Sequence, residues 1–217
     1  MYVSKHHQLN DRDAVFALME THPLGAWVCQ SKEGLVANHV PFFLDRTRGP
    51  HGTLMGHVAR ANSVWRQLAS DTPSVVMFQG AQSYITPGWY PGKAEHGKVV
   101  PTWNYVVAHA HGTAQVIEDP HWMLGMLNRL TDAQESRQTC PWRVGDAPPD
   151  FIDKLMRGIV GIEISIDRLD GKLKASQDED VQDRHGTVRG LQSNHNGASR
   201  EMAELVLNTL ASEGPQS

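Results

Sequence analysis

In the N-terminal part of the chain, the spacing of apolar residues changes from that of a helix to that of a strand. Val15, Leu18 and Met19 fall on one helix face, which Asn10 can cap and Pro23 ends. Beyond this helix, apolar residues alternate with polar ones, which predicts strands joined by short turns. The elements expected here are a helix over residues 11–21, strands over 24–30, 35–44 and 53–59, and a short helix over 63–68.

The middle of the chain predicts further strands and one long loop. Residues 74–79 and 82–86 are strand candidates separated by Gly80, and residues 87–98 form a loop rich in Gly and Pro. Residues 104–117 give the clearest strand, because small and apolar side chains occupy alternate positions over most of it. The face expected to be buried carries Val106, Ala108, Ala110, Ala114 and Val116.

The last third of the chain predicts helices around one more strand. Asp119 and Pro120 begin a helix, and the strand over residues 159–167 alternates cleanly. One face of that strand, with Val160, Ile162, Ile164 and Ile166, is expected to meet a core, and the opposite face, with Gly161, Glu163, Ser165 and Asp167, to meet water. Further helices are expected over residues 150–157, 178–192 and 199–210.

These elements favour an α+β fold. Most strands are separated by turns, the helices lie at the margins, and no βαβ alternation is visible. We therefore predict an antiparallel sheet closed into a small, split β-barrel with peripheral helices, and not a doubly wound parallel sheet.

Composition narrows the class of protein. A chain of 217 residues with 40% hydrophobic residues suits one large domain or a domain with a helical appendage. Its formal charge of −4 and lack of a basic run predict no direct DNA binding, which depends on clustered cations. Cys29 and Cys140 lack CxxC spacing, and Met1 precedes no signal or membrane segment, so we expect a cytoplasmic protein.

The segment from Gly80 to Gly112 is unusually rich in aromatic and polar residues. Trp89 and Thr102–Tyr105 offer stacking faces with hydroxyl and amide groups beside them, which suits a planar ring with polar edges. The alternative is that Trp103 and Tyr105 pack one end of a barrel. The whole cluster favours the binding interpretation.

The run from Gly56 to Asn62 could bind a phosphate. His57 and Arg60 end a strand, and Asn62 stands before a short helix, so a cation, donors and a helix start come together. The alternative is equally open: Asn62 only caps the helix, Arg60 makes a surface ion pair, and His57 is an ordinary polar residue.

Other chemistry has little support in the sequence. His109 and His111 share a strand face and could both contact a metal, but no third ligand is evident, so we expect hydrogen bonding and no metal site. A CxxCH haem motif is missing, as are the usual nucleophile, zinc-protease, Walker and dinucleotide signatures.

Five motifs follow one another along the chain: Ala37–Phe42, Gly56–Asn62, Ser83–Tyr90, Val100–Tyr105 and Lys172–Gln177. Together, and in this order, they resemble the PaiB family over nearly the whole chain. That family is described as FMN-binding negative transcriptional regulators with a split β-barrel similar to pyridoxamine-phosphate oxidases and flavin reductases.

The resemblance implies a homodimer with FMN in a cleft between subunits. It suggests Arg60, Asn62, Lys174 and Gln177 for the phosphate and ribityl chain, and Tyr84, Thr86, Trp103 and Asn104 for the ring. No residue is assigned a catalytic role. The full set of expected cofactor-binding residues is His39, His57, Arg60, Asn62, Tyr84, Thr86, Trp89, Thr102, Trp103, Asn104, Lys174 and Gln177.

The expected organisation is an FMN-binding split-barrel domain over residues 1–175 and a helical extension over residues 176–217 that packs on it. The first functional hypothesis is a cytoplasmic flavin-dependent oxidoreductase acting on a small molecule. The alternatives are a negative transcriptional regulator acting through DNA or a partner, and a haem-binding split-barrel protein.

Overall fold

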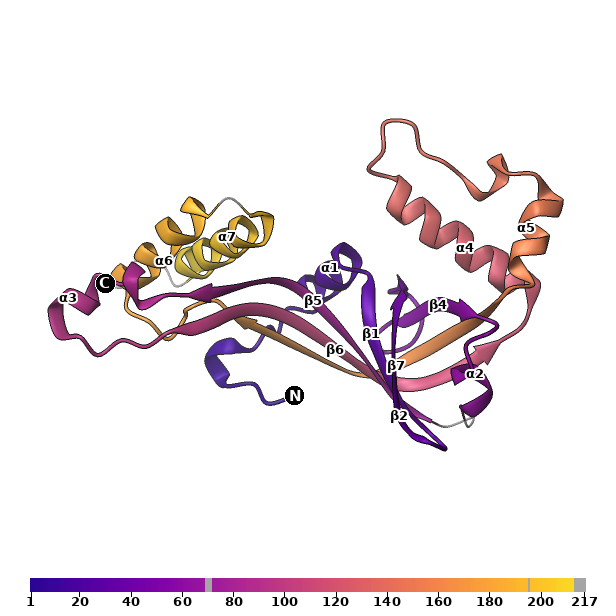
Figure 1. The fold of residues 1–217 in the computed structure, drawn as a ribbon, viewed down its shortest axis with the longest axis horizontal. Helices are drawn as coiled ribbons and strands as arrows, with labels where there is room; N and C mark the ends of the chain where they lie inside the picture. The colour runs from indigo at the N-terminus through magenta and orange to yellow at the C-terminus, as the bar shows by residue number, and fades with distance from the viewer. Residues whose placement is uncertain (69–71, 195, 213–217) are drawn as a thin grey trace. The chain divides into compact units, whose positions relative to one another are not determined.

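The computed structural model describes residues 1–68, 72–194 and 196–212 (Figure 1). The chain divides into two compact units. The first unit comprises Met1–Leu18, Gln79–Ala108 and the described residues from Asp170 onward, and the second comprises Met19–Phe78 and His109–Leu169. Residues 213–217 of the expected C-terminal extension lie outside the described residues.

The strands form one antiparallel sheet of seven strands in the order β2-β1-β5-β6-β7-β4-β3. In the second unit, β1 pairs antiparallel with β2 and β5, and β4 pairs antiparallel with β3 and β7. The α+β class and the antiparallel sheet are therefore confirmed. The strands are β1 (Leu24–Ser31), β2 (Gly34–Pro41), β3 (Phe43–Asp45), β4 (Thr53–Ala59), β5 (Pro73–Ile85), β6 (Thr102–Ile117) and β7 (Ile159–Lys174).

The sheet does not close on itself, so the small barrel expected from the sequence is present as a split one. In the part of the chain that the structure describes, the order of paired strands is linear and ends at β2 and β3. Near its end β2 lies against β4 without pairing: a Cβ on Gly56 would stand 2.9 Å from the Pro41 carbonyl oxygen and 3.0 Å from the Val40 side chain. Pro41 has no N–H to extend a ladder, which favours a split at this position.

The helices and strands largely follow the sequence pattern, with two differences in the middle of the chain. Residues 73–85 form a single strand that Gly80 does not interrupt. The expected loop 87–98 contains a 3₁₀ turn, η2 (Pro87–Trp89), and a short helix, α3 (Gly92–His96). None of the helices among the described residues combines the length and apolar composition that a membrane crossing requires. The others are η1 (Lys5–His7), α1 (Arg12–Thr21), α2 (Val64–Gln67), α4 (Pro120–Glu135), η3 (Val144–Asp146), α5 (Pro149–Met156), α6 (Val181–Ser193) and α7 (Gly197–Ser212).

In the second unit, α4 covers part of β7 that the sequence pattern assigned to water. Ile162 and Ile164 are buried as expected, but so are Gly161 and Glu163 on the opposite face. The reason is Trp122 of α4, whose ring lies where a Cβ on Gly161 would be and whose Nε1 donates to a Glu163 carboxylate oxygen at 2.9 Å. Gly161 therefore leaves space for the Trp122 ring of α4. The alternation of apolar and polar residues along β7 could not show this.

The buried carboxylate of Glu163 is fully paired. Arg48 donates two hydrogen bonds to it, at 2.7 and 2.8 Å, in the bidentate geometry that suits a guanidinium. Burial alone would raise the pKa of Glu163, but hydrogen bonds from Arg48 and Trp122 outweigh burial and hold the pKa below its ordinary value. A carboxyl whose pKa is lowered by folding stabilises the protein at any pH above its pKa in the unfolded chain. This contribution is lost as the pH falls through its pKa in the folded protein.

Glu163→Gln is expected to lower the free energy of unfolding at neutral pH by about 1–2 kcal/mol. Removing one partner of a buried pair costs more than this, but the Arg48 side chain is 44% exposed, so solvent screens the loss. The difference from the unsubstituted protein should shrink as the pH falls below about 4.5, the ordinary glutamate pKa.

Urea unfolding at several pH values measures this effect. Glu20→Gln is the matched control, because Glu20 pairs with Arg46 at an exposed site and should cost at most about 0.5 kcal/mol. Equal effects of the two substitutions, or a loss in Glu163→Gln that does not change with pH, would contradict the assignment.

In the first unit, α6 and α7 pack together over an apolar cluster (Figure 1). Ile85 of β5 and Ala175 beyond β7 are fully buried in this cluster, together with Leu191 of α6 and Met202 and Val206 of α7. The two C-terminal helices thus complete the core of this unit. A domain boundary at residue 175 stays a prediction.

Candidate functional site

The expected cofactor-binding residues fall in both units, and each group is described by itself. The larger group lies in the first unit, on β5, β6 and the segment after β7, and the smaller group lies on β2, β4 and the turn after β4 in the second. The first-unit group is Tyr84, Thr86, Trp89, Thr102, Trp103, Asn104, Lys174 and Gln177, and the second-unit group is His39, His57, Arg60 and Asn62.

Two neighbouring strands of the first unit present an exposed aromatic pair. Tyr84 of β5 and Trp103 of β6 lie edge to face, with ring centroids 6.0 Å apart and an interplanar angle of 68°. The side chains are 47% and 53% exposed, which is unusual for large rings on central strands. A flat ligand can therefore stack here without any core residue moving.

A cation and a hydroxyl meet at the end of β7. The Lys174 ammonium donates a hydrogen bond to the Thr102 hydroxyl, and both side chains are half-buried. The following turn is fixed by Gln177, whose amide nitrogen donates to the Leu173 carbonyl and whose amide oxygen accepts from the Ala175 N–H, each at 2.7 Å. A phosphate oxygen could accept from both Lys174 and Thr102.

Asn104 lies inside the first unit. It is fully buried, and its amide nitrogen donates to the Ser176 hydroxyl at 2.8 Å, whereas its amide oxygen has no hydrogen-bond partner among the described residues. Ser176 is itself buried and has a φ of 60°, the left-handed conformation that costs a non-glycine residue energy. Ser176, a phosphate-compatible donor in the Lys172–Gln177 motif, was not in the set of expected cofactor-binding residues, and the sequence did not show its contact with Asn104.

Thr86 and Trp89 have local structural partners. The Thr86 hydroxyl accepts a hydrogen bond from the Gly88 N–H at 3.2 Å and so caps η2. The ring of Trp89 lies against α6, where a Cβ on Gly190 would overlap it and a Cβ on Gly186 would overlap the Trp89 carbonyl oxygen. Trp89 thus packs against a helix backbone, a contact that the sequence interpretation did not include.

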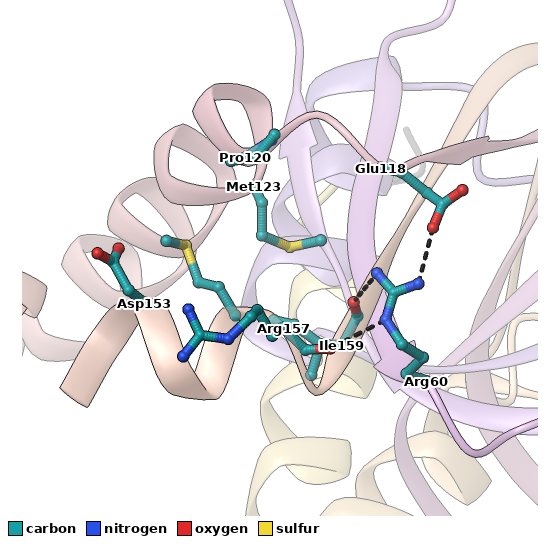
Figure 2. A pocket seen from close by; sticks show the side chains of 8 residues that line it. Arg60, Glu118, Pro120, Met123, Asp153, Arg157 and Ile159 are labelled. Carbon is teal, nitrogen blue, oxygen red and sulfur yellow. Dashed lines mark hydrogen bonds and ion pairs between the residues drawn. The ribbon is translucent and has the colours of Figure 1, made fainter. Parts of the chain in front are cut away.

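In the second unit, Arg60 joins three segments that are distant in sequence (Figure 2). Its guanidinium donates to Glu118 at 2.7 Å and to the carbonyl oxygens of Arg157 and Ile159 at 2.9 and 3.1 Å. It also lies 5.6 Å from the centre of the Trp65 ring. These contacts include the ion pair of the alternative interpretation, and the phosphate role of Arg60 stays a prediction.

Asn62 makes the capping contact that the alternative interpretation expected. Its amide oxygen accepts the Val64 N–H at 3.0 Å, and its amide nitrogen donates to the Asn38 amide oxygen at 2.7 Å. The following helix, α2, has only four residues. The buried amide nitrogen of Asn38 has no hydrogen-bond partner among the described residues, so this asparagine pair keeps one donor for another group.

The histidines differ in their surroundings. Burial lowers the pKa of His57, whose Nδ1 has no hydrogen-bond partner among the described residues, so this ring is neutral at pH 7. His39 is exposed on β2, opposite Ala26 of β1. His109 and His111 have ring centroids 6.3 Å apart, and no three His, Cys, Asp or Glu residues in the described ranges are arranged to hold a metal.

A pocket of about 280 Å³ lies beside Arg60 in the second unit (Figure 2). It is formed by the turn after β4, by the connection from β6 into α4, and by the end of α5 with the start of β7. The sequence interpretation missed it, because its residues come from three separate stretches of the chain. The lining residues are Arg60, Glu118, Pro120, Met123, Asp153, Met156, Arg157 and Ile159.

Comparisons with known proteins identify the family of this chain. Residues 1–168 match the family described as "Putative FMN-binding domain". The Bacillus subtilis protein named protease synthase and sporulation protein PAI 2 is 26% identical, over 95% of this chain and 96% of its own. An uncharacterised protein of Emericella nidulans is 30% identical, again over 95% of this chain and 96% of its own. The PaiB resemblance is thus confirmed.

A solved structure shows the same fold. The FAD and haem binding protein from Mycobacterium smegmatis matches 77% of this chain and 73% of its own, with a TM-score of 0.57 and 21% sequence identity. At this identity the likeness concerns the fold alone.

Proposed function

We propose, since the chain belongs to this family of FMN-binding domains, that it is a flavin-dependent protein that oxidises or reduces a small molecule. The observations that carry the proposal are two first-unit contacts, the ring pair of Tyr84 with Trp103 and the hydrogen bond from Lys174 to Thr102. FMN, when bound, supplies one- and two-electron redox chemistry, and the protein supplies binding, orientation and electrostatics.

The first-unit residues have the chemistry that a phosphorylated flavin requires. The exposed rings of Tyr84 and Trp103 offer apolar surface to the isoalloxazine. The ammonium of Lys174 and the hydroxyl of Thr102 are donors for a phosphate. Gln177 holds the turn that follows Lys174, and Asn104 holds Ser176 of the same turn, so we assign these two residues a positioning role.

The second-unit residues support a separate set of contacts. Two of the five N–H groups of the Arg60 guanidinium are not used by the hydrogen bonds described above, and the Asn38 and Asn62 pair keeps one buried donor. We propose that Arg60 and Asn62 contact the ribityl or phosphate part of the flavin, with His57 and the exposed His39 near them. Thr86 and Trp89 shape the first-unit segment after Tyr84.

We also propose a cytoplasmic homodimer. In the first unit, Trp103 and Tyr84 expose large apolar surfaces, and Tyr2 is 84% exposed. Exposed apolar residues of this kind often mark interaction sites, and a second copy is the partner that the family resemblance suggests. Cys29 and Cys140 are both free, which fits a reducing compartment.

Regulation is the second candidate, supported by the name of the Bacillus subtilis relative, which concerns protease synthesis and sporulation. The net charge of −4 argues for an indirect route through a partner or a metabolite. Haem binding is a third candidate, because the Mycobacterium smegmatis protein of similar fold is named for binding haem as well as FAD.

An absorption spectrum of the purified protein, recorded before and after adding FMN and removing the excess, separates these candidates. The proposal expects flavin bands that stay with the protein, and dithionite should bleach them. Light scattering should give twice the chain mass of 24.1 kDa. A Soret band without flavin bands, or retention of neither chromophore together with salt-resistant binding to an operator, would contradict it.

A further inference from the structure

The pocket beside Arg60 has features that flavin binding does not use. Its volume of about 280 Å³ lies just below the range of roughly 300–1,000 Å³ that is typical of ligand pockets. It therefore suits a small metabolite and is small for a flavin nucleotide. All of its lining residues belong to the second unit, so the pocket is complete within one unit.

The middle of the pocket is apolar. Met123 of α4, Met156 of α5 and Ile159 of β7 line it, and Figure 2 shows Met123 and Ile159. Methionine side chains are flexible and polarisable, so they adapt to aliphatic and aromatic groups alike. The pocket can thus hold the apolar body of a small molecule.

At one edge of the pocket, the positive charge is already paired with a carboxylate. Arg60 lies there in its ion pair with Glu118, and the carbonyl oxygens of Arg157 and Ile159 accept further hydrogen bonds from it (Figure 2). Within the pocket, the charge of Arg60 is thus balanced by Glu118.

The other edge carries two charges without partners. Asp153 and Arg157 lie four residues apart at the end of α5, and among the described residues neither side chain has a hydrogen-bond or ion-pair partner (Figure 2). Residues at this spacing have Cβ atoms about 5–6 Å apart on one helix face. A carboxylate and a guanidinium are thus both available at the same edge.

From this arrangement we infer that the pocket binds a small zwitterion with an apolar body, namely an α-amino acid with an aliphatic or aromatic side chain. The ligand carboxylate pairs with Arg157, its ammonium pairs with Asp153, and its side chain lies on Met123, Met156 and Ile159. Asp153 and Arg157 are both exposed at this edge. A ligand with both charges can pair with both groups, whereas a simple anion or a simple cation can pair with only one of them.

Titration calorimetry of the full chain with L-phenylalanine, L-leucine and L-methionine tests this inference. At least one of the three should bind with one site per chain. Its analogues without the ammonium or without the carboxylate, such as 3-phenylpropionate and phenethylamine, should bind at least about tenfold more weakly, since each lacks one charge-assisted contact.

Variants locate the site. Arg157→Gln and Asp153→Asn should each weaken binding by about tenfold or more. Lys154→Gln, on the same helix but outside the pocket, should bind like the unsubstituted protein. Circular dichroism and FMN affinity, measured on each variant, should be unchanged, so a failure of this inference is separate from a failure of the flavin proposal.

The inference is overturned if none of the three amino acids binds. It is equally overturned if an analogue with a single charge binds as tightly as the amino acid, or if Arg157→Gln and Asp153→Asn bind like Lys154→Gln.

Discussion

Gly186→Ala should destabilise the protein by about 1–3 kcal/mol, although alanine is the better helix former. Gly186 lies within α6, and a Cβ at this position would overlap the carbonyl oxygen of Trp89. Because the clash is with backbone, rotating a side chain cannot relieve it. Either α6 or the η2 segment must move, and the apolar cluster beneath α6 is disturbed.

Gly125→Ala is the matched control. Gly125 lies in the interior of α4, exposed, with no atom within 4 Å of the position of a Cβ. Here the substitution should stabilise the protein by about 0.5–1 kcal/mol, because only the helix preference changes. The two variants thus make the same chemical change in a helix and should shift the urea midpoint in opposite directions. Equal shifts would show that α6 does not pack on Trp89 in this way.

Lys174→Gln should weaken FMN binding by about 10- to 150-fold. The ammonium of Lys174 lies beside the Thr102 hydroxyl, and loss of one hydrogen bond to a charged group costs roughly 1.5–3 kcal/mol. Flavin fluorescence during titration measures the change in the dissociation constant. Riboflavin has no phosphate, so its affinity should stay the same in this variant.

Lys93→Gln controls for the loss of a positive charge in the same unit. Lys93 is exposed on α3, and its substitution should change FMN affinity less than about twofold at physiological salt, where distant charges are screened. If Lys174→Gln weakens riboflavin and FMN equally, Lys174 acts through the fold and does not hold the phosphate.

The strands with a regular period were predictable from the sequence. The alternation in β6 correctly identified Val106, Ala108, Ala110 and Ala114 as buried, because alternate side chains of a strand share one face. The same reasoning failed for Gly161 and Glu163 in β7, because α4 covers their face through Trp122. A strand period tells which residues share a face, and not what covers that face.

The candidate site was predictable only in part. Trp103 was expected from the aromatic composition of its segment and Tyr84 from the family resemblance, and the structure brings them together because β5 and β6 are neighbours in the sheet. The surroundings of Arg60 could not be predicted, because its partners Glu118, Arg157 and Ile159 are distant in sequence. The contact between Trp89 and α6 had a signal that we did not use: two glycines four residues apart in a helix, Gly186 and Gly190.

The central claim is that the first-unit residues Tyr84, Trp103, Thr102 and Lys174 contact a phosphorylated flavin, and a paired titration of the unsubstituted protein with FMN and riboflavin tests it most directly. The account predicts saturable binding of both, with FMN tighter by about tenfold or more because of its phosphate. No saturable binding of either flavin, or equal affinity for the two, would contradict it.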